Sequence, residues 1–368
     1  MGDYYIGLIS GTSMDCIDAA LVKFEEASVE IIRTHEHRYP ENLRDQLLLA
    51  IREPEKFMVD DIGQLDRRVG ESFRDAAIEL IENTGIDAAA VTAIGSHGQT
   101  IRHQPDALHP FTLQIGDPSL IATGTGIRTV ADFRRTDVAL GGQGAPLTPL
   151  FHEWLFNKPG SNRVVLNIGG IANITIMPGD AADTSGFDTG PGNTLLDAWV
   201  HRHLKQSFDK NGDWAAQGEA SADLLERLLT DPYFNADPPK STGFEYFNLE
   251  WLEAADLSTS NAVDVQATLS ALTANSIAAA IHQYAGDPSD VFVCGGGVHN
   301  SDLLQRLGAA LPGISVTTTE SAGLDPDWVE AVAFAWLAMR NLQGLPGNLP
   351  AVTGASRPAV LGATYSPA

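Results

Sequence analysis

An apolar strand, a glycine-rich turn and a second apolar strand, followed by helices, occur in this order twice in the chain. The first copy has predicted strands at 4–10 and 17–24 around the turn Gly11–Asp15. The second copy has predicted strands at 163–167 and 171–177 around Gly169 and Gly170. A hairpin with following βα units that is duplicated in one chain predicts two α/β domains of related fold facing a cleft.

The second copy is followed by Gly186-Phe187-Asp188-Thr189-Gly190-Pro191-Gly192-Asn193, which reads as a glycine turn that opens a helix. Helix starts present unpaired N–H groups and favour anions, so such a turn suits a phosphate. A tight strand-to-helix connection with Asp or Asn as the N-cap would use the same residues, and the composition of the turn leaves both interpretations open. Asp188 would repel a phosphate and is expected to face water, a metal or a second substrate.

A third glycine turn, Cys294–Asn300, follows the predicted strand 290–294. No turn matches the P-loop pattern, because no Lys-Ser/Thr pair follows a glycine at the required spacing, and none matches the dinucleotide fingerprint. Three such turns on a duplicated α/β plan indicate a nucleotide. Its triphosphate would lie between two hairpin tips and its nucleoside end on the third turn.

Charge and composition exclude several classes of protein. The formal net charge of −24 over 368 residues opposes nucleic-acid binding, and any anionic substrate then needs a local cluster of positive groups. The two cysteines give no disulfide framework, and neither His35/His37 nor His201/His203 forms a helical i, i+4 pair around an acid, so no zinc enzyme is expected. Without a signal peptide or a long apolar segment, the chain is expected to be cytoplasmic and not membrane-bound.

The sequence resembles the sugar kinase/Hsp70/actin superfamily and, within it, the anhydro-N-acetylmuramic acid kinases. The resemblance covers nearly the whole chain. The strings that carry it are Gly7–Asp15, Gly95–Thr100, Gln114–Asp117, Val130–Arg134, Gly141–Leu147, Asn167–Asn173, Gly186–Asn193, Glu330-Ala331 and Gly347–Ala355.

The resemblance implies an α/β fold with two actin-like (ribonuclease H-like) domains, 1–135 with the tail 345–368 and 136–344, and a cleft between them for nucleotide and sugar. It implies that ATP and water convert 1,6-anhydro-N-acetylmuramic acid to N-acetylmuramic acid 6-phosphate and ADP in peptidoglycan recycling, with Mg²⁺ on the phosphates. A homodimer is also implied. In such a reaction a carboxylate takes the proton of water, and the departing O6 attacks the γ-phosphoryl group.

Site residues follow from the matching motifs. Asp188 is the expected catalytic base and also contacts the substrate, although it could instead orient Mg²⁺ through water. The expected sugar-binding residues are His97, Gln99, Arg134 and Glu330. The expected ATP-binding residues are Gly11, Thr12, Ser13, Met14, Asp15, Cys16, Ile17, Asp18, Gly169, Gly170, Asn173, Gly190, Gly192, Asn193, Gly295, Gly296 and Gly297.

Several of the polar residues in these motifs have a purely structural alternative. His97 could be a satisfied buried histidine, Arg134 could form a surface salt bridge, and Glu330 could cap its helix or face solvent. Lys240 could reach a phosphate or be exposed, and no role is assigned to it. Cys16 stands where the family usually has glycine, which would cost about 1 kcal/mol if the position needs a positive φ.

Two other functions fit parts of the pattern. A kinase of the same superfamily that acts on another sugar hydroxyl would need Asp188 to deprotonate that hydroxyl. An ATP-driven chaperone or filament protein would share the fold, but a chaperone needs a peptide-binding domain for which the chain has no room, and a filament protein leaves the sugar-side motifs unexplained.

Overall fold

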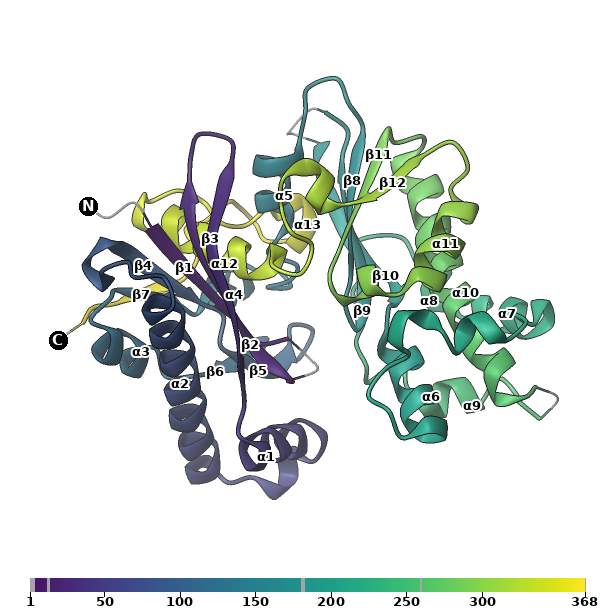
Figure 1. Cartoon of the computed structure of the whole chain (residues 1–368), viewed down its shortest axis with the longest axis horizontal. Helices are drawn as coiled ribbons and strands as arrows, with labels where there is room; N and C mark the ends of the chain where they lie inside the picture. Colours follow the sequence, from purple (N-terminus) through teal and green to yellow (C-terminus); the bar gives the residue numbers. More distant parts are fainter. Residues whose placement is uncertain (1–3, 12–13, 180–182, 259, 368) are drawn as a thin grey trace. The chain divides into compact units, whose positions relative to one another are not determined.

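A computed structural model describes residues 4–11, 14–179, 183–258 and 260–367 of the chain. The chain divides into two compact units, Met1–Leu155 with Trp328–Ala368 and Phe156–Asp327 (Figure 1). These boundaries differ from the expected ones, since segments 136–155 and 328–344 were expected in the second domain and belong to the first unit.

The first unit is built on a mixed sheet with the strand order β13-β7-β4-β1-β2-β3. Strands β1, β2 and β3 pair antiparallel, whereas β4 pairs parallel to β1 and β7 parallel to β4. The strands of this unit are β1 (Tyr4–Ile9), β2 (Cys16–Phe24), β3 (Val29–Arg38), β4 (Val91–Ser96), β7 (Thr129–Ala131) and β13 (Ala363–Tyr365), with a separate hairpin of β5 (Gln99–Gln104) and β6 (Phe111–Ile115).

Helices cover both faces of this sheet. Ile6 and Leu8 of β1 belong to one apolar core with α2, and alternation along the strand points Gly7 to the other face, where α12 packs. A Cβ at Gly7 would overlap the Ala331 carbonyl of α12, and its partner on β4, Gly95, lies equally close to that helix. The helices are α1 (Glu41–Arg52), α2 (Val59–Glu82), α3 (Pro118–Thr125), α4 (Phe133–Ala139), α5 (Pro149–Phe156), α12 (Val329–Leu342) and α13 (Pro350–Thr353).

The second unit has the strand order β10-β9-β8-β11-β12. Strands β8, β9 and β10 pair antiparallel, and β8, β11 and β12 pair parallel. One face packs on α10 and α11, and a second core lies among α6, α7, α9 and α10. The elements are β8 (Arg163–Ile168), β9 (Ile171–Met177), β10 (Ser185–Pro191), β11 (Asp290–Cys294), β12 (Ser315–Thr318), α6 (Thr194–Leu204), α7 (Ala222–Leu229), α8 (Pro232–Asn235), α9 (Leu249–Glu253), α10 (Ala262–Ala280), a π-helical turn at Ile281–Ala285 and α11 (Ser301–Ala310).

The two sheets share one plan. In both, a three-stranded antiparallel meander is extended on the side of its first strand by two parallel strands. The predicted duplication and the actin-like α/β class are therefore confirmed. Within the described residues no helix is both long enough and apolar enough to span a bilayer.

One prediction about this region was wrong. Residues 185–191 do not form a turn but the strand β10, which pairs with β9 and carries a bulge between Asp188 and Gly190. Phe187 sits in the core, where it anchors the strand, and the expected helix starts only at Thr194. The glycines predicted a turn, whereas Gly190 lies within the strand and packs against Phe234.

Candidate active site

Asp188 lies on β10, where the segment 233–242 holds both its backbone and its side chain. Its N–H donates to the Lys240 carbonyl at 3.2 Å, and its carbonyl accepts from the Tyr233 hydroxyl at 2.8 Å. The Thr242 N–H donates to carboxylate Oδ2 at 3.0 Å, while Oδ1 accepts no hydrogen bond from the residues that the structure describes. One oxygen is thus fixed, and the other is available to a ligand.

Burial raises the pKa of Asp188 to about 7, although its side chain keeps some exposure, and the Thr242 bond offsets part of the rise. Lys240 does not neutralise the carboxylate. Its ammonium donates to the carbonyls of Tyr233 and Phe234 at 3.1 and 3.3 Å and lies 5.0 Å from the centre of the Tyr233 ring. A carboxyl group that exchanges its proton near neutral pH has the acidity that a general base requires.

Asp188 is one end of a polar row that crosses the sheet. Asn173 on β9 lies directly opposite Asp188, and Asn167 on β8 lies opposite Asn173. Directly paired residues share a face, and the neighbouring Phe187 and Ile174 point into the core. The row therefore lies on the face away from α10 and α11, at the carboxyl end of β8.

The turn between β8 and β9 is bonded to the start of α6. The N–H groups of Gly192 and Thr194 donate to the Gly170 carbonyl at 2.9 and 3.1 Å, and that of Asn193 donates to the Gly169 carbonyl at 2.9 Å. N–H groups at a helix start are the usual donors to a phosphate. Because these three are already used, any contact of this region with a nucleotide must involve other groups.

Two predicted ATP-binding glycines have a packing reason to be glycine. A Cβ at Gly192 would overlap the Gly169 carbonyl, and one at Gly190, whose φ is 147°, would press on the Phe234 ring. Their role at a nucleotide stays a prediction.

The third glycine turn packs on the end of β8. A Cβ at Gly295 would overlap the Asn167 side chain, and one at Gly297 would overlap Ile168. Gly296 is open, with only the Asn193 amide as near as 4.0 Å. The predicted nucleotide residues Asn193, Gly169 and Gly295–Gly297 thus gather at the carboxyl ends of the parallel strands β8 and β11, where α/β sheets usually bind ligands.

In the first unit, the predicted nucleotide loop leads into β2. Thr12 and Ser13 lie outside the described residues. Met14 has a φ of 51°, and Arg44 holds the loop through the Met14 carbonyl at 3.2 Å and the Asp15 carboxylate at 2.7 Å. A Cβ at Gly11 would meet no atom of the described residues within 4 Å.

The three predicted nucleotide residues that follow, Cys16, Ile17 and Asp18, are strand residues. Ile17 is fully buried in the core, backbone and side chain alike, and its role at a nucleotide stays a prediction. Cys16 begins β2 and does not have a positive φ, so the strain expected of a non-glycine residue there does not arise. Burial and Asp18 raise the pKa of its thiol, which keeps the thiol protonated.

Two of the predicted sugar residues, His97 and Arg134, are bonded to each other. Arg134 Nε donates to His97 Nε2 at 3.0 Å, and His97 Nδ1 donates to the Gly98 carbonyl at 2.8 Å. Burial and the Arg134 charge hold the pKa of His97 well below its usual range, so its ring is neutral. With both ring nitrogens used, His97 is a satisfied buried histidine that orients Arg134.

Arg134 is also held by the loop 141–146, because its Nη1 donates to the Gly144 carbonyl at 2.8 Å. Nη2 has no partner among the described residues. Burial lowers the pKa of Arg134 to about 10, which leaves the guanidinium charged at neutral pH. A charged group fixed at two nitrogens and open at the third suits an anionic ligand.

Glu330 and Gln99 complete the predicted sugar residues. Glu330 lies in the first turn of α12 and keeps an exposed surface. Desolvation by the surrounding protein raises the pKa of its carboxyl group, and the positive charge of Arg134 offsets part of that rise. Gln99 begins β5 and is 2% exposed, and its Oε1 has no hydrogen-bond partner among the residues that the structure describes. A buried carbonyl oxygen without a donor is costly unless a ligand supplies one.

Asp137 is a central residue that the sequence analysis missed. It is fully buried on α4 and accepts bonds from the Gly144 N–H at 2.8 Å, from Asn348 at 2.7 Å and from Thr353 at 2.8 Å. Arg134 and Asp137, one helical turn apart, thus hold the carbonyl and the N–H of Gly144. This network ties the tail to the loop that positions the guanidinium.

Comparison with known proteins places these features in context. A family model described as "Anhydro-N-acetylmuramic acid kinase" matches residues 3–367. Curated relatives with that name include one from Shewanella oneidensis, 53% identical over 365 residues (99% of this chain, 98% of the relative), and one from Coxiella burnetii, 51% identical over 363 residues (98% and 97%). Among solved structures, the activator of the 2-hydroxyisocaproyl-CoA dehydratase from Clostridium difficile with bound ADPNP is similar, with a TM-score of 0.47 and 11% identity over 92% of this chain and 96% of that chain.

Proposed function

The chain belongs to the anhydro-N-acetylmuramic acid kinase family, and from this premise we propose that Asp188 is its catalytic base. The chain is a phosphotransferase that acts on a sugar hydroxyl with ATP as the phosphoryl donor. The observation that carries the proposal for Asp188 is its carboxyl group, which has a pKa of about 7, one oxygen fixed by Thr242 and the other available.

The reaction opens the 1,6-anhydro bond and phosphorylates O6 in the same step. Water attacks C1 of the sugar and gives its proton to Asp188 as the C1–O6 bond breaks. O6 takes the electron pair of that bond and attacks the γ-phosphorus of ATP, and ADP leaves. Because O6 leaves onto phosphorus, no general acid is needed, in contrast to an inverting glycosidase with its two carboxyl groups.

ATP would lie against the turns at the carboxyl ends of β8 and β11, with the open Gly296 nearest to it. Support comes from the gathering of Gly169, Asn193 and Gly295–Gly297 at that edge. The amides of Asn173 and Asn167, which lie beside Asp188 in the polar row, offer oxygen ligands that suit Mg²⁺, directly or through water. Mg²⁺ would neutralise charge on the phosphates when bound.

For the sugar, Arg134 would bind the lactyl carboxylate through its open nitrogen. His97 acts behind it as a positioning residue, and Gln99 would accept a bond from a sugar hydroxyl or amide through its unpartnered Oε1. Glu330, exposed and near the Arg134 charge, would hold a hydroxyl or assist the attacking water. The homodimer and the cytoplasmic location that the resemblance implies are further proposals.

A product assay with two substrates tests the function. The chain should phosphorylate 1,6-anhydro-N-acetylmuramic acid and incorporate one solvent oxygen at C1, detected by mass spectrometry in ¹⁸O-water. Equal rates with ordinary N-acetylmuramic acid would contradict the proposal and favour a kinase of a plain sugar hydroxyl.

The Asp188→Asn variant tests the base. Turnover should fall by about 10²–10⁴-fold while ATP affinity persists, because general-base catalysis contributes that much. A loss of ATP affinity that depends on Mg²⁺ would instead assign Asp188 to the metal.

A further inference from the structure

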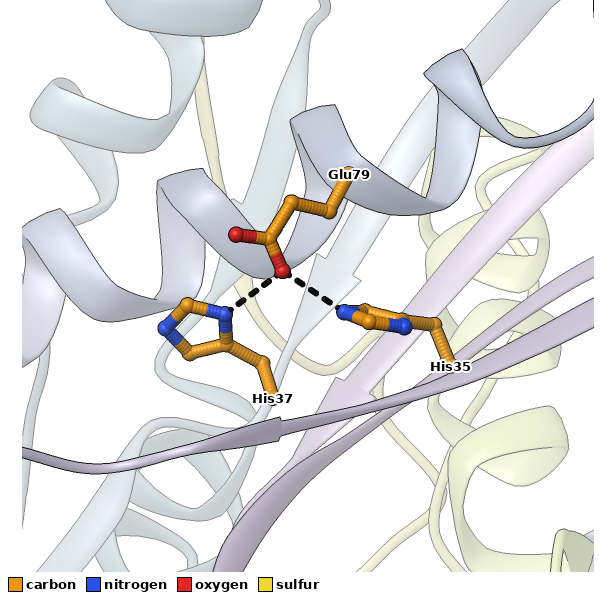
Figure 2. A group of neighbouring side chains, drawn as sticks. All are labelled: His35, His37 and Glu79. Atoms are coloured by element: carbon orange, nitrogen blue, oxygen red, sulfur yellow. Dashed lines mark hydrogen bonds and ion pairs between the residues drawn. The ribbon is translucent and has the colours of Figure 1, made fainter.

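Two histidines and a glutamate meet at the open edge of the first unit's sheet, and none of the three is among the site residues assigned above (Figure 2). His35 Nε2 and His37 Nδ1 lie 2.7 and 2.9 Å from the same oxygen, Oε2 of Glu79. These three atoms all lie within 4.8 Å of one another. Both histidines come from β3 and the glutamate from α2, as Figure 2 shows.

The strand geometry brings the two rings together. Residues two apart on a strand share a face, and His35 and His37 pair with Ala19 and Ile17, whose side chains belong to the core under α2. The histidines thus occupy inward positions on an edge strand, where an apolar residue would be the ordinary choice. Glu79 on α2 lies opposite the two rings and contacts both of them.

We propose that His35, His37 and Glu79 bind one divalent transition-metal ion of the Zn²⁺ class and thereby cross-link β3 to α2. Two imidazoles and a carboxylate are ligands that suit Zn²⁺, and water would fill the fourth position. Mg²⁺ and Ca²⁺ prefer oxygen ligands and would bind poorly here.

The spacing of the three atoms allows such an ion after a small movement. Tetrahedral Zn²⁺ with bonds of about 2.0–2.1 Å places neighbouring ligand atoms about 3.3 Å apart. Glu79 must therefore withdraw by about half an ångström from each ring, and its side chain is 45% exposed and has room to move. The two ring nitrogens, which lie within 4.8 Å of each other, must settle at about the same 3.3 Å spacing. The histidine side chains are 25% and 17% exposed, so an ion reaches them from solvent.

A different explanation of the same residues is edge protection. Inward-pointing polar side chains on an edge strand discourage pairing with another chain. That explanation needs no ion, and it predicts that replacing the histidines by valine causes aggregation without any effect of Zn²⁺. The two explanations differ in metal binding, which is measurable.

Calorimetric titration of the full chain with Zn²⁺ in excess Mg²⁺ tests the proposal. We expect one equivalent of Zn²⁺ to bind and to raise the melting temperature, since an ion that binds only the folded chain stabilises it. Co²⁺ in its place should give the visible absorption of a four-coordinate site. The variants His35→Asn, His37→Asn and Glu79→Gln should each lose the high-affinity equivalent and the shift in melting temperature.

The matched control is the double variant His201→Asn/His203→Asn, whose histidines are also two apart but on a helix, where such residues face different directions. It should keep the Zn²⁺ equivalent. Circular dichroism without metal identifies any variant that fails to fold, and the conservative Glu79→Gln change keeps the test decisive in that case. Absence of a Zn²⁺ equivalent in the parent chain, or its survival in all three variants, would overturn the proposal.

Discussion

Asp188 keeps its proton in the folded chain up to about pH 7, whereas an aspartate in an unfolded chain loses it near about pH 3.9. Between these values the folded state binds the extra proton, so stability falls as the pH rises through that window. Asp188→Asn keeps an acceptor for the Thr242 N–H and removes the charge.

This variant should therefore melt higher than the parent chain at about pH 8 and gain less at about pH 5. Melting curves at both values measure the difference, with the exposed Asp223→Asn as the control. An equal gain at both values would show that Asp188 has an ordinary pKa. Loss of turnover together with a gain in stability would show that the carboxylate is kept for catalysis at a cost in stability.

A substitution at His97 tests whether this residue orients Arg134 or contacts the sugar itself. His97→Ala removes the acceptor of Arg134 Nε, and hydrogen bonds to charged groups contribute about 1.5–3 kcal/mol. We expect the KM for the sugar to rise by about tenfold or more, with kcat and the KM for ATP little changed. His97→Gln, whose amide oxygen can replace Nε2, should recover part of the loss.

Steady-state kinetics with the sugar varied at saturating ATP provide the measurement. If His97→Ala lowers kcat and leaves the KM for the sugar unchanged, or if Gln and Ala behave alike, the positioning role is wrong.

At the scale of single elements, α12 depends on two glycines. Gly7→Ala puts a methyl group into the Ala331 carbonyl, where backbone must move, and it should lower stability by about 3 kcal/mol or more, at the upper end of overpacking. Because Glu330 lies on α12, sugar affinity should fall as well. Gly63→Ala is the matched control. Gly63 lies on α2 with no atom near its missing Cβ, so that change should raise stability by about 0.5–1 kcal/mol.

Denaturant unfolding of both variants measures these changes. A Gly7→Ala chain as stable as the parent would mean that α12 does not need this close contact.

The elements also show what a sequence can and cannot predict. The hairpin strands and the long helix α2 follow from apolar periodicity, and the repeated plan follows from their order. The strand β10 was missed because three glycines outweighed its alternation of Phe187 with Asp188. Alternation would also have indicated the row of Asn167, Asn173 and Asp188, since these residues take the outward positions of their strands.

Contacts between distant segments left no signal of their own. Glu79 is 44 residues from His35, and Asn348 is 211 residues from Asp137. The motif string around Arg134 predicted a site, but not that His97 would orient it. Such pairings depend on how the sheet and its helices pack, which spacing in the sequence does not determine.

At the scale of the whole molecule, the net charge affects how fast charged substrates associate with the protein. The formal net charge of −24 repels ATP and the sugar carboxylate alike, and this repulsion is screened over about 8 Å at physiological salt. Arg134, fixed at two nitrogens, is the positive group that we propose for the sugar carboxylate, and it acts at short range. We therefore expect kcat/KM for the sugar to rise with ionic strength at constant free Mg²⁺.

The control is the methyl ester of the lactyl group, which removes the substrate's charge and should flatten the salt dependence. A fall in kcat/KM with added salt would mean that local positive charge around Arg134, rather than the acidic surface, governs the encounter. The slope of kcat/KM against ionic strength for the acid, compared with that for the ester, thus shows whether the acidic surface or the local positive charge dominates the association of the sugar. Since steering acts on association, the effect should reside in kcat/KM and leave kcat unchanged.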